Sequence, residues 1–186
     1  MNLLDWFAKG LTYDQYKGQM KVNLDEMSTV YEQFELQAEA KTELQSLKGV
    51  ASKVIVLTED WCGDALMNNP ILMKMAEELG LDVRFVLRDS NLELMDQYLT
   101  NGTARSIPIF IFIDDEGNEK AVWGPRAPEA QSMVDGFRAE LPAKDAEDFE
   151  GKQKAMYKKI KQTYVENRAL WDAVASSILN KLDKVK

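Results

Sequence analysis

The single cysteine of the chain, Cys62, stands where a reactive sulfur is usually placed. It follows the apolar run Val54–Leu57 and precedes a helical pattern, so it lies at a junction between a strand and a helix. Free backbone N–H groups and the positive end of the helix dipole stabilise an anion there and lower the pKa of a thiol. A lone cysteine is otherwise often a small buried hydrophobe. The position favours thiol chemistry and leaves the structural role open.

Three acidic residues surround this thiol in the sequence, Glu59, Asp60 and Asp64. Asp64 falls in the first helical turn, where a carboxylate complements the dipole. It is also a candidate proton acceptor, because the chain contains no histidine. Carboxylates raise the pKa of a nearby thiol, which opposes the helix end. We predict Cys62 and Asp64 as the catalytic residues, and a working thiol requires that the helix end dominates.

Two separate motifs resemble those of the thioredoxin superfamily. Trp61-Cys62-Gly63 matches the start of its W-C-G-P-C signature, and Pro70 follows at the position of a helix-kinking proline. Far downstream, the segment 105–112 resembles the loop in which a cis-proline, here Pro108, precedes an apolar strand. The resemblance covers about residues 52–141. It implies an α/β thioredoxin fold, with a central mixed sheet of at least four strands and helices on both faces.

The departures from this family pattern concern its redox chemistry. Ala65 stands in place of the second, resolving cysteine, and Asp64 in place of the intervening proline. Val56 replaces a buried acid that many thioredoxins carry. No intramolecular thiol is present to release a mixed disulfide, which excludes an ordinary dithiol reductase. The W-C-G-D variant resembles a bacterial branch of thioredoxin-like proteins with helical extensions.

The resemblance also implies a shallow substrate groove beside the sulfur. Its residues here are Trp61, Ile107, Pro108 and Gly124, and the Ile107–Pro108 bond is expected to be cis. Arg126 follows the groove glycine. It is a candidate to offset the acids or to hold a carboxylate of a small thiol, although an exposed loop arginine is the interpretation we prefer.

The composition limits the possible binding partners of the protein and its cellular compartment. A chain of 186 residues suits one domain with extensions. The net charge of −8 argues against nucleic acid. The lysines from Lys152 to Lys161 are interpreted as a solvated helix face. A single cysteine, without a secretory pattern or an apolar membrane-spanning stretch, indicates the cytoplasm. We expect no metal site, no cofactor, and no membrane partner.

Residues 1–51 are predicted to form an N-terminal helical extension. Glycines interrupt its first part, which predicts two short helices. A longer helix should then run from Asn23, as the N-cap, to about Lys48-Gly49. Its apolar stripe consists of Leu24, Met27, Tyr31, Phe34 and Ala38.

Residues 52–141 alternate between strand and helix patterns, as in parallel βαβ units. Strands are predicted at 54–57, 83–87, 109–113 and 119–123, and the last two should form an antiparallel hairpin at the edge. Helices are predicted from Cys62 to about Gly80 with a kink near Pro70, from a cap at Ser90 or Asn91 to near Asn101-Gly102, and from 129 to 141.

Residues 142–186 are predicted to be a C-terminal helical extension of one or two helices packed on the core. Apolar residues line one face over several turns, and this stripe needs a partner surface. We favour the same chain over a second copy, since connected helices are usually neighbours, and expect a monomer or homodimer. The stripe comprises Met156, Ile160, Tyr164, Trp171, Val174, Ile178 and Leu182.

Two functions from different classes follow. In the first, Cys62 carries out monothiol exchange with protein or low-molecular-weight disulfides, and an external thiol resolves the adduct. In the second, the protein is a non-catalytic module that docks peptide in the groove. Retention of Trp61, Cys62, Gly63 and Pro108 puts the first slightly ahead, whereas loss of the resolving cysteine favours the second.

Overall fold

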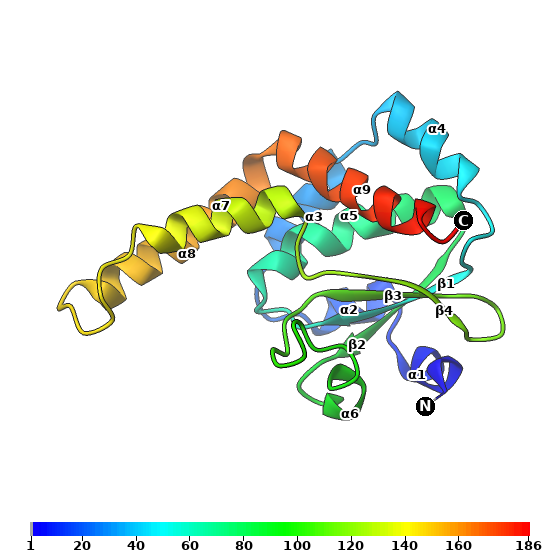
Figure 1. Cartoon of the computed structure of the whole chain (residues 1–186), viewed down its shortest axis with the longest axis horizontal. Helices are drawn as coiled ribbons and strands as arrows, with labels where there is room; N and C mark the ends of the chain where they lie inside the picture. The colour runs from blue at the N-terminus through cyan, green and yellow to red at the C-terminus, as the bar shows by residue number, and fades with distance from the viewer. Residues whose placement is uncertain (1) are drawn as a thin grey trace.

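The computed structural model describes residues 2–186 and shows a mixed sheet covered by helices, with further helices at both ends of the chain (Figure 1). Met1, where the predicted N-terminal extension begins, lies outside the described residues. The elements are, in order, α1 (Leu3–Lys9), α2 (Tyr13–Gln19), α3 (Leu24–Gln33), α4 (Ala38–Ser46), β1 (Lys53–Thr58), α5 (Gly63–Leu79), β2 (Asp82–Leu87), α6 (Leu92–Met95), β3 (Ile109–Ile113), β4 (Glu119–Trp123), α7 (Pro128–Ala139), α8 (Phe149–Glu166) and α9 (Arg168–Asp183).

The sheet confirms the predicted α/β fold class. Its strands lie in the order β2-β1-β3-β4. β1 pairs in parallel with β2 and antiparallel with β3, and the β3–β4 hairpin forms an antiparallel edge. The turn of this hairpin is built on Asp114, whose Oδ1 accepts hydrogen bonds from the backbone N–H groups of Glu116 and Asn118. This is the turn chemistry that the acidic, glycine-containing linker predicts.

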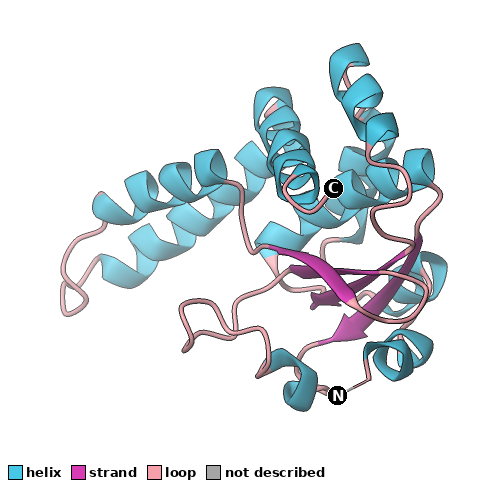
Figure 2. Ribbon diagram, turned by 45° about the vertical axis from the view of Figure 1, so that its right-hand side comes forward, coloured by secondary structure: helices cyan, strands magenta, loops and turns pink. Residues whose placement is uncertain are grey.

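Alternate side chains of the central strands enter two different cores. Val54 and Val56 of β1 pack on the side of α3, α5, α8 and α9, whereas Ile55 and Leu57 pack on the side of α1 and α6. All four are fully buried. A strand covered on both faces has no polar side, which explains the continuous apolar run in the sequence. Figure 2 shows the thick helical layer on one face of the sheet and the thinner one on the other.

The predicted long N-terminal helix is wrong, because the chain forms two helices, α3 and α4, separated by an extended segment. Phe34 has an extended backbone (φ −76°, ψ 128°) and ends α3. Its buried ring packs edge-on against Trp171 of α9 at 6.4 Å. Packing against α9 overrides the helical periodicity here. Asn23 does precede α3, but its side chain makes no capping bond and its Nδ2 donates to the Asp60 carbonyl instead.

The predicted helix from Ser90 or Asn91 to near Asn101-Gly102 is also wrong in length, because α6 covers only Leu92–Met95. After Met95 the backbone N–H groups of Gln97 and Tyr98 donate to carbonyl oxygens three residues back, those of Leu94 and Met95, so tight turns replace the α-helix. The chain then turns back on itself, with Thr100 bridging to Ala104. Arg105 holds the Asp96 carboxylate through two hydrogen bonds and fixes this turn.

The C-terminal segment forms two helices that pack on the thioredoxin-like core. α8 and α9 both contact α5, and the whole predicted apolar stripe from Met156 to Leu182 is buried. Asn167 separates the helices and caps α9, its side chain accepting from the Leu170 N–H. α7 and α8 project beyond the sheet as a helical hairpin (Figure 1). Within residues 2–186 no helix has the length and apolarity needed to cross a membrane.

Candidate functional site

Cys62 is the N-cap residue of α5, directly at the end of the β1–α5 loop. Its thiol is buried, with 7% of the residue exposed. The Sγ donates a hydrogen bond to the carbonyl oxygen of Ile107 at 3.4 Å. This bond joins the two sequence motifs, which lie 45 residues apart. The structure therefore brings the predicted thiol and the predicted proline loop into contact.

The environment of the sulfur raises its pKa, to about 12. Burial is the main cause, and the negative charge of Asp64 is the next. The backbone N–H groups of Ala65 and Asp64 and the guanidinium of Arg126 lower the pKa, but they do not offset the first two causes. The balance between helix end and carboxylates, which the sequence leaves open, thus falls on the side of a neutral thiol.

Of the four predicted groove residues, Trp61 directly precedes Cys62, Ile107 accepts the hydrogen bond of the sulfur, and Pro108 is in contact with Gly124. The Ile107–Pro108 bond is cis. Gly124 has φ 129°, and a Cβ at this position would lie 2.2 Å from the Pro108 carbonyl oxygen, so only glycine fits there. Within residues 2–186 the backbone N–H of Ile107 donates no hydrogen bond. A free donor therefore lies beside the cysteine.

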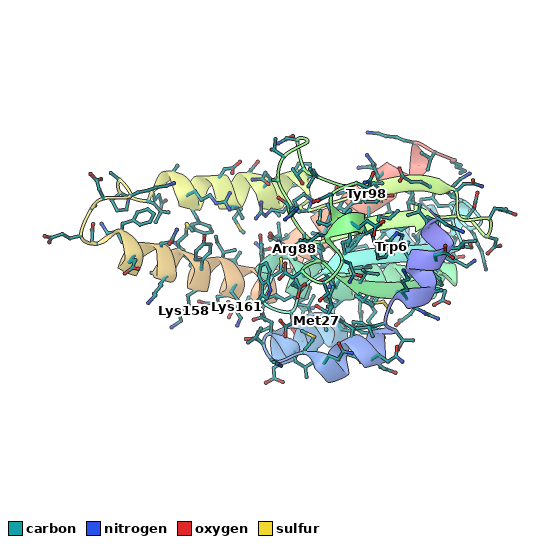
Figure 3. The ribbon with its side chains drawn as sticks, turned by 90° about the horizontal axis from the view of Figure 1, so that it is seen from below. Trp6, Met27, Arg88, Tyr98, Lys158 and Lys161 are labelled. Carbon is teal, nitrogen blue, oxygen red and sulfur yellow. The ribbon has the colours of Figure 1, made fainter. Side chains whose placement is uncertain are left out.

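Trp61 forms the exposed part of the groove. Its side chain is 51% exposed, unlike that of its neighbour Cys62. The guanidinium of Arg88, labelled in Figure 3, lies 4.8 Å from the centre of the indole ring. Arg88 also donates to the Arg105 carbonyl at 3.0 Å. The indole is thereby supported from the segment that leads to the cis-proline.

Asp64 is held by Arg126, which the sequence offers as a candidate to offset the acids, and by Tyr164, which no sequence pattern links to it. Arg126 donates a hydrogen bond from Nε to Oδ1 at 2.8 Å, and its Nη2 forms an ion pair with Oδ2 at 2.8 Å. Tyr164 of α8 donates its hydroxyl to Oδ1. The preferred interpretation of Arg126 as an exposed loop residue is wrong, since its side chain is 17% exposed and paired. This geometry favours a structural role for Asp64, and its catalytic role stays a prediction.

The pKa of Tyr164 is raised, mainly by burial and then by the charge of Asp64. The hydroxyl therefore stays protonated and acts as a donor to the carboxylate. Gln131 completes the cluster by accepting from Arg126 Nη1 at 2.9 Å. Sequence reasoning placed Tyr164 in the apolar stripe of α8 but missed its polar end, because no local pattern links residues 100 positions apart.

The other two acids near the thiol fix the β1–α5 loop. Glu59 accepts from the Asp89 N–H at 2.8 Å, and burial raises the pKa of its carboxyl. Asp60 accepts from the Lys21 N–H at 2.7 Å. Both carboxylates thus have backbone partners, which favours a positioning role for them. Within residues 2–186 no group of three acidic or sulfur ligands lies close enough to hold a metal ion.

A cavity of about 460 Å³ opens next to Cys62, between the start of α5 and the α7–α8 hairpin. Sequence reasoning missed the part of its wall that α7 and α8 supply. Its lining consists of Asn23, Trp61, Cys62, Gly63, Asp64, Arg126, Val134, Arg138, Tyr157, Ile160, Lys161 and Tyr164.

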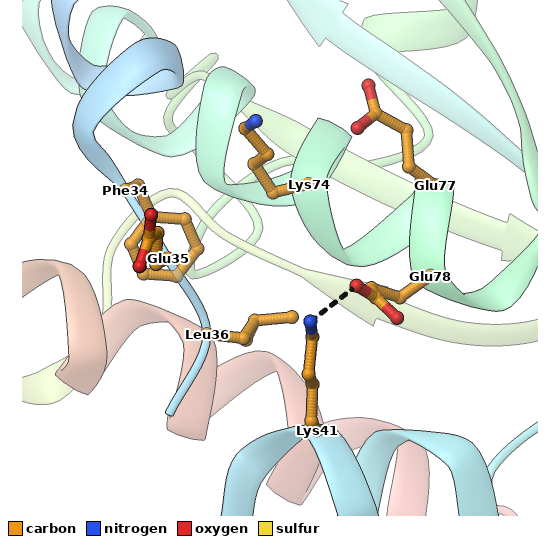
Figure 4. A pocket seen from close by; sticks show the side chains of 7 residues that line it. All are labelled: Phe34, Glu35, Leu36, Lys41, Lys74, Glu77 and Glu78. Atoms are coloured by element: carbon orange, nitrogen blue, oxygen red, sulfur yellow. Dashed lines mark ion pairs between the residues drawn. The ribbon is translucent and has the colours of Figure 1, made fainter. Parts of the chain in front are cut away.

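A larger cavity of about 600 Å³ lies elsewhere, where the α3–α4 connection meets α5 (Figure 4). Its lining is mostly charged, and Lys41 and Glu78 form an ion pair across it at 3.1 Å. None of its seven lining residues belongs to the cysteine site. The chemistry near Cys62 and the aromatic side chains around it make the smaller cavity the candidate functional site.

Comparisons with known proteins agree with this geometry. A family model described as thioredoxin matches residues 10–146. A crystal structure of an HIV epitope-scaffold is similar, with a TM-score of 0.70 and 14% identity over 100% of both chains. A protein of unknown function from Pseudomonas aeruginosa is similar too, with a TM-score of 0.69 and 14% identity over 100% of this chain and 99% of that one.

These two structures support the fold and carry no functional assignment at this level of identity. No curated protein sequence matches the chain. The family match covers most of the chain, including the Cys62 motif, the Pro108 loop and helices that precede β1. The chain therefore belongs to the thioredoxin family, as a W-C-G-D variant without the resolving cysteine and with helical extensions at both ends.

Proposed function

We propose that this protein is a thioredoxin-fold binding module that docks an extended peptide in the groove beside Cys62. The observation that carries the proposal is the contrast between a buried thiol and the exposed indole beside it. Cys62 is 7% exposed and its thiol donates a hydrogen bond to the Ile107 carbonyl, whereas the adjacent Trp61 is 51% exposed. A thiol that keeps its proton is a poor nucleophile. The groove can bind without any reaction at the sulfur.

Binding would use the free backbone N–H of Ile107. An extended peptide can accept this hydrogen bond as an added strand accepts bonds from a sheet edge. Trp61 supplies apolar contact area beside it, and Gly124 lets the two loops approach closely. A reducing compartment, the cytoplasm, is part of the proposal because Cys62 then stays a free thiol.

Monothiol exchange is the second candidate, and one observation favours it. The N–H groups of Ala65 and Asp64 and the Arg126 guanidinium all act to lower the pKa of Cys62. In this scheme the Cys62 thiolate attacks one sulfur of a substrate disulfide, and the other sulfur leaves as a thiolate. An external thiolate then attacks the mixed disulfide and releases Cys62. Asp64 would accept the thiol proton in this scheme, although Arg126 and Tyr164 already occupy its oxygens.

A peptide-display selection tests the binding module. The full chain is immobilised under reducing conditions and challenged with random dodecapeptides. We expect enrichment over the bare support, loss of enrichment in Trp61→Ala, and no loss in Val22→Ala, an exposed apolar residue outside the site. Cys62→Ala should bind as the wild type does. Enrichment that survives Trp61→Ala, or that requires the Cys62 sulfur, would contradict the proposal.

A further inference from the structure

The cavity beside the groove contains the most exposed aromatic side chains of the described chain. Tyr157 is 53% exposed and Trp61 is 51% exposed, the two highest values among the exposed large hydrophobic residues of this part. Both line the same cavity, although they lie in α8 and in the β1–α5 loop. Val134 and Ile160, which are buried, form apolar parts of its lining. Such a surface fits an aromatic or aliphatic side chain.

The charges that line this cavity differ in sign from the protein as a whole. The chain carries a net charge of −8. The cavity is lined by Arg126, Arg138 and Lys161 but by a single carboxylate, that of Asp64. Its lining therefore has an excess of positive charge, which attracts an anionic ligand.

Internal ion pairs leave one of these cations free. Arg126 is committed to Asp64, and Lys161 pairs with Glu26 of α3 at 2.5 Å. Arg138, in the last turn of α7, forms no ion pair within residues 2–186. A planar guanidinium without a partner can bind a carboxylate with two parallel hydrogen bonds.

We infer that this cavity binds an acidic peptide segment in which a carboxylate side chain stands next to an aromatic or aliphatic one. The inference rests on the proposed peptide-binding function and specifies its ligand. The apolar side chain packs between Trp61 and Tyr157, and the carboxylate pairs with Arg138. The volume of about 460 Å³ suits one large side chain with its charged neighbour.

The two ends of the site have different origins in the chain. Val134 and Arg138 come from α7, the last helix of the thioredoxin-like core, whereas Tyr157, Ile160 and Lys161 come from α8 of the C-terminal extension. The α7–α8 hairpin projects beyond the sheet next to the start of α5 (Figure 1). The core thus supplies the docking of the peptide backbone and the guanidinium of Arg138, and the C-terminal extension supplies the aromatic wall at Tyr157.

A charge reversal with a matched control tests this inference. Arg138→Glu is compared with Lys158→Glu, an equal change of charge at an exposed α8 residue that does not line the cavity (Figure 3). Each full-length variant is taken through the same dodecapeptide selection. The wild type and Lys158→Glu should enrich peptides with Asp or Glu adjacent to Phe, Trp, Leu or Ile. Arg138→Glu should lose this preference.

A synthetic peptide from the wild-type selection then gives the magnitude. Replacing its Asp by Asn should weaken binding to the wild type by roughly tenfold, as expected for one charge-assisted hydrogen-bonded pair, and change little in Arg138→Gln. Equal binding of both peptides to the wild type would overturn the acidic specificity and leave peptide binding intact. Absence of any enriched peptide would overturn the proposed function itself. Loss of the preference in Lys158→Glu as well would mean that overall charge, not this cavity, selects the peptide.

Discussion

At Asp64 a single carboxylate joins three segments that are far apart in the sequence. It lies in the first turn of α5, accepts a hydrogen bond from and forms an ion pair with Arg126 after β4, and accepts a second hydrogen bond from Tyr164 of α8. The side chains of Asp64 and Arg126 are 12% and 17% exposed. A largely buried carboxylate needs such donors, because an unpaired charge is costly in this environment. Burial is the main cause of the raised pKa of Cys62, and the charge of Asp64 raises this pKa further, whereas Arg126 acts to lower it.

Tyr164→Phe should remove one donor from this carboxylate and leave the ring in place. We expect a loss of about 1–3 kcal/mol in the free energy of unfolding, measured by urea denaturation, as for other hydrogen bonds to charged groups. Tyr157→Phe removes a hydroxyl from an exposed tyrosine of the same helix and should change stability very little. Equal effects of the two substitutions would show that the bond to Asp64 contributes nothing specific.

The raised pKa of Cys62 also predicts a pH dependence of stability. The native thiol keeps its proton up to about pH 12, whereas a thiol in the unfolded chain loses its proton near pH ~8.5. Below about pH 8.5 the thiol is protonated in both states, so its contribution to the free energy of unfolding is fully present. Above this pH the unfolded state binds fewer protons than the native state, so the free energy of unfolding falls as the pH rises.

Tyrosines of the unfolded chain are half titrated near pH ~10 and several native tyrosines have raised pKa values, so they also lower the free energy of unfolding toward that pH. The thiol is therefore isolated by the difference between two proteins: from pH ~8.5 to ~10 the wild type should lose about 1–2 kcal/mol more than Cys62→Ala. Urea titrations of both proteins at several pH values measure the difference. Parallel curves for the two proteins would contradict a strongly raised pKa in the native state.

Among the elements, the loops at Pro108 and Gly124 depend on a close backbone approach. Gly124→Ala places a Cβ 2.2 Å from the Pro108 carbonyl oxygen at φ 129°, so the loop must move. We expect the free energy of unfolding to fall by about 3 kcal/mol, measured by urea denaturation. Gly136→Ala is the matched control, because this glycine lies inside α7 with open space around its Cα. It should raise stability by roughly 0.5–1 kcal/mol. A tolerated Gly124→Ala would show that the groove does not need this contact.

The strands and their pairing were predictable because their patterns are local. Ile109–Ile113 is apolar at every position and is followed by a turn-forming segment, which together predict a buried strand and a hairpin. The break after α3 was not predictable. Phe34 continues the helical stripe, but its buried partner Trp171 lies in another helix far along the chain. Helical periodicity indicates which residues are buried. It does not indicate where packing against another helix ends the element.

The candidate site was predictable only in part for the same reason. The motif residues around Cys62 and Pro108 can be found from their spacing, and the structure brings them together. Arg138, Tyr157 and Tyr164 reach the site through the packing of α7 and α8 on α5. No sequence pattern links them to Cys62. The direction in which the pKa of Cys62 shifts could likewise not be predicted. Burial is the main cause of this shift, and burial depends on the completed fold.

At the scale of the whole molecule, the C-terminal helices belong to the same packed body as the sheet. Trp171 is buried, and its Nε1 donates to the Tyr164 carbonyl at 2.7 Å. Ending the chain at Pro142 removes α8 and α9 and uncovers their packing surface on α5. We expect such a protein to lose cooperative thermal unfolding or to aggregate. Removal of Val185 and Lys186 alone should leave the melting temperature nearly unchanged. A soluble truncated chain with the wild-type melting temperature would mean that the segment is an independent arm.

The most direct test of the account is the pH dependence of iodoacetamide labelling of Cys62 in the native full-length chain. A thiol that is neutral in the native protein should be labelled slowly at neutral pH, with a midpoint well above the value of about 8.5 for a free cysteine, and should form no mixed disulfide with an oxidised small thiol. Fast labelling at neutral pH, with a midpoint below that value and a stable mixed disulfide, would contradict the binding module and establish Cys62 as a working monothiol.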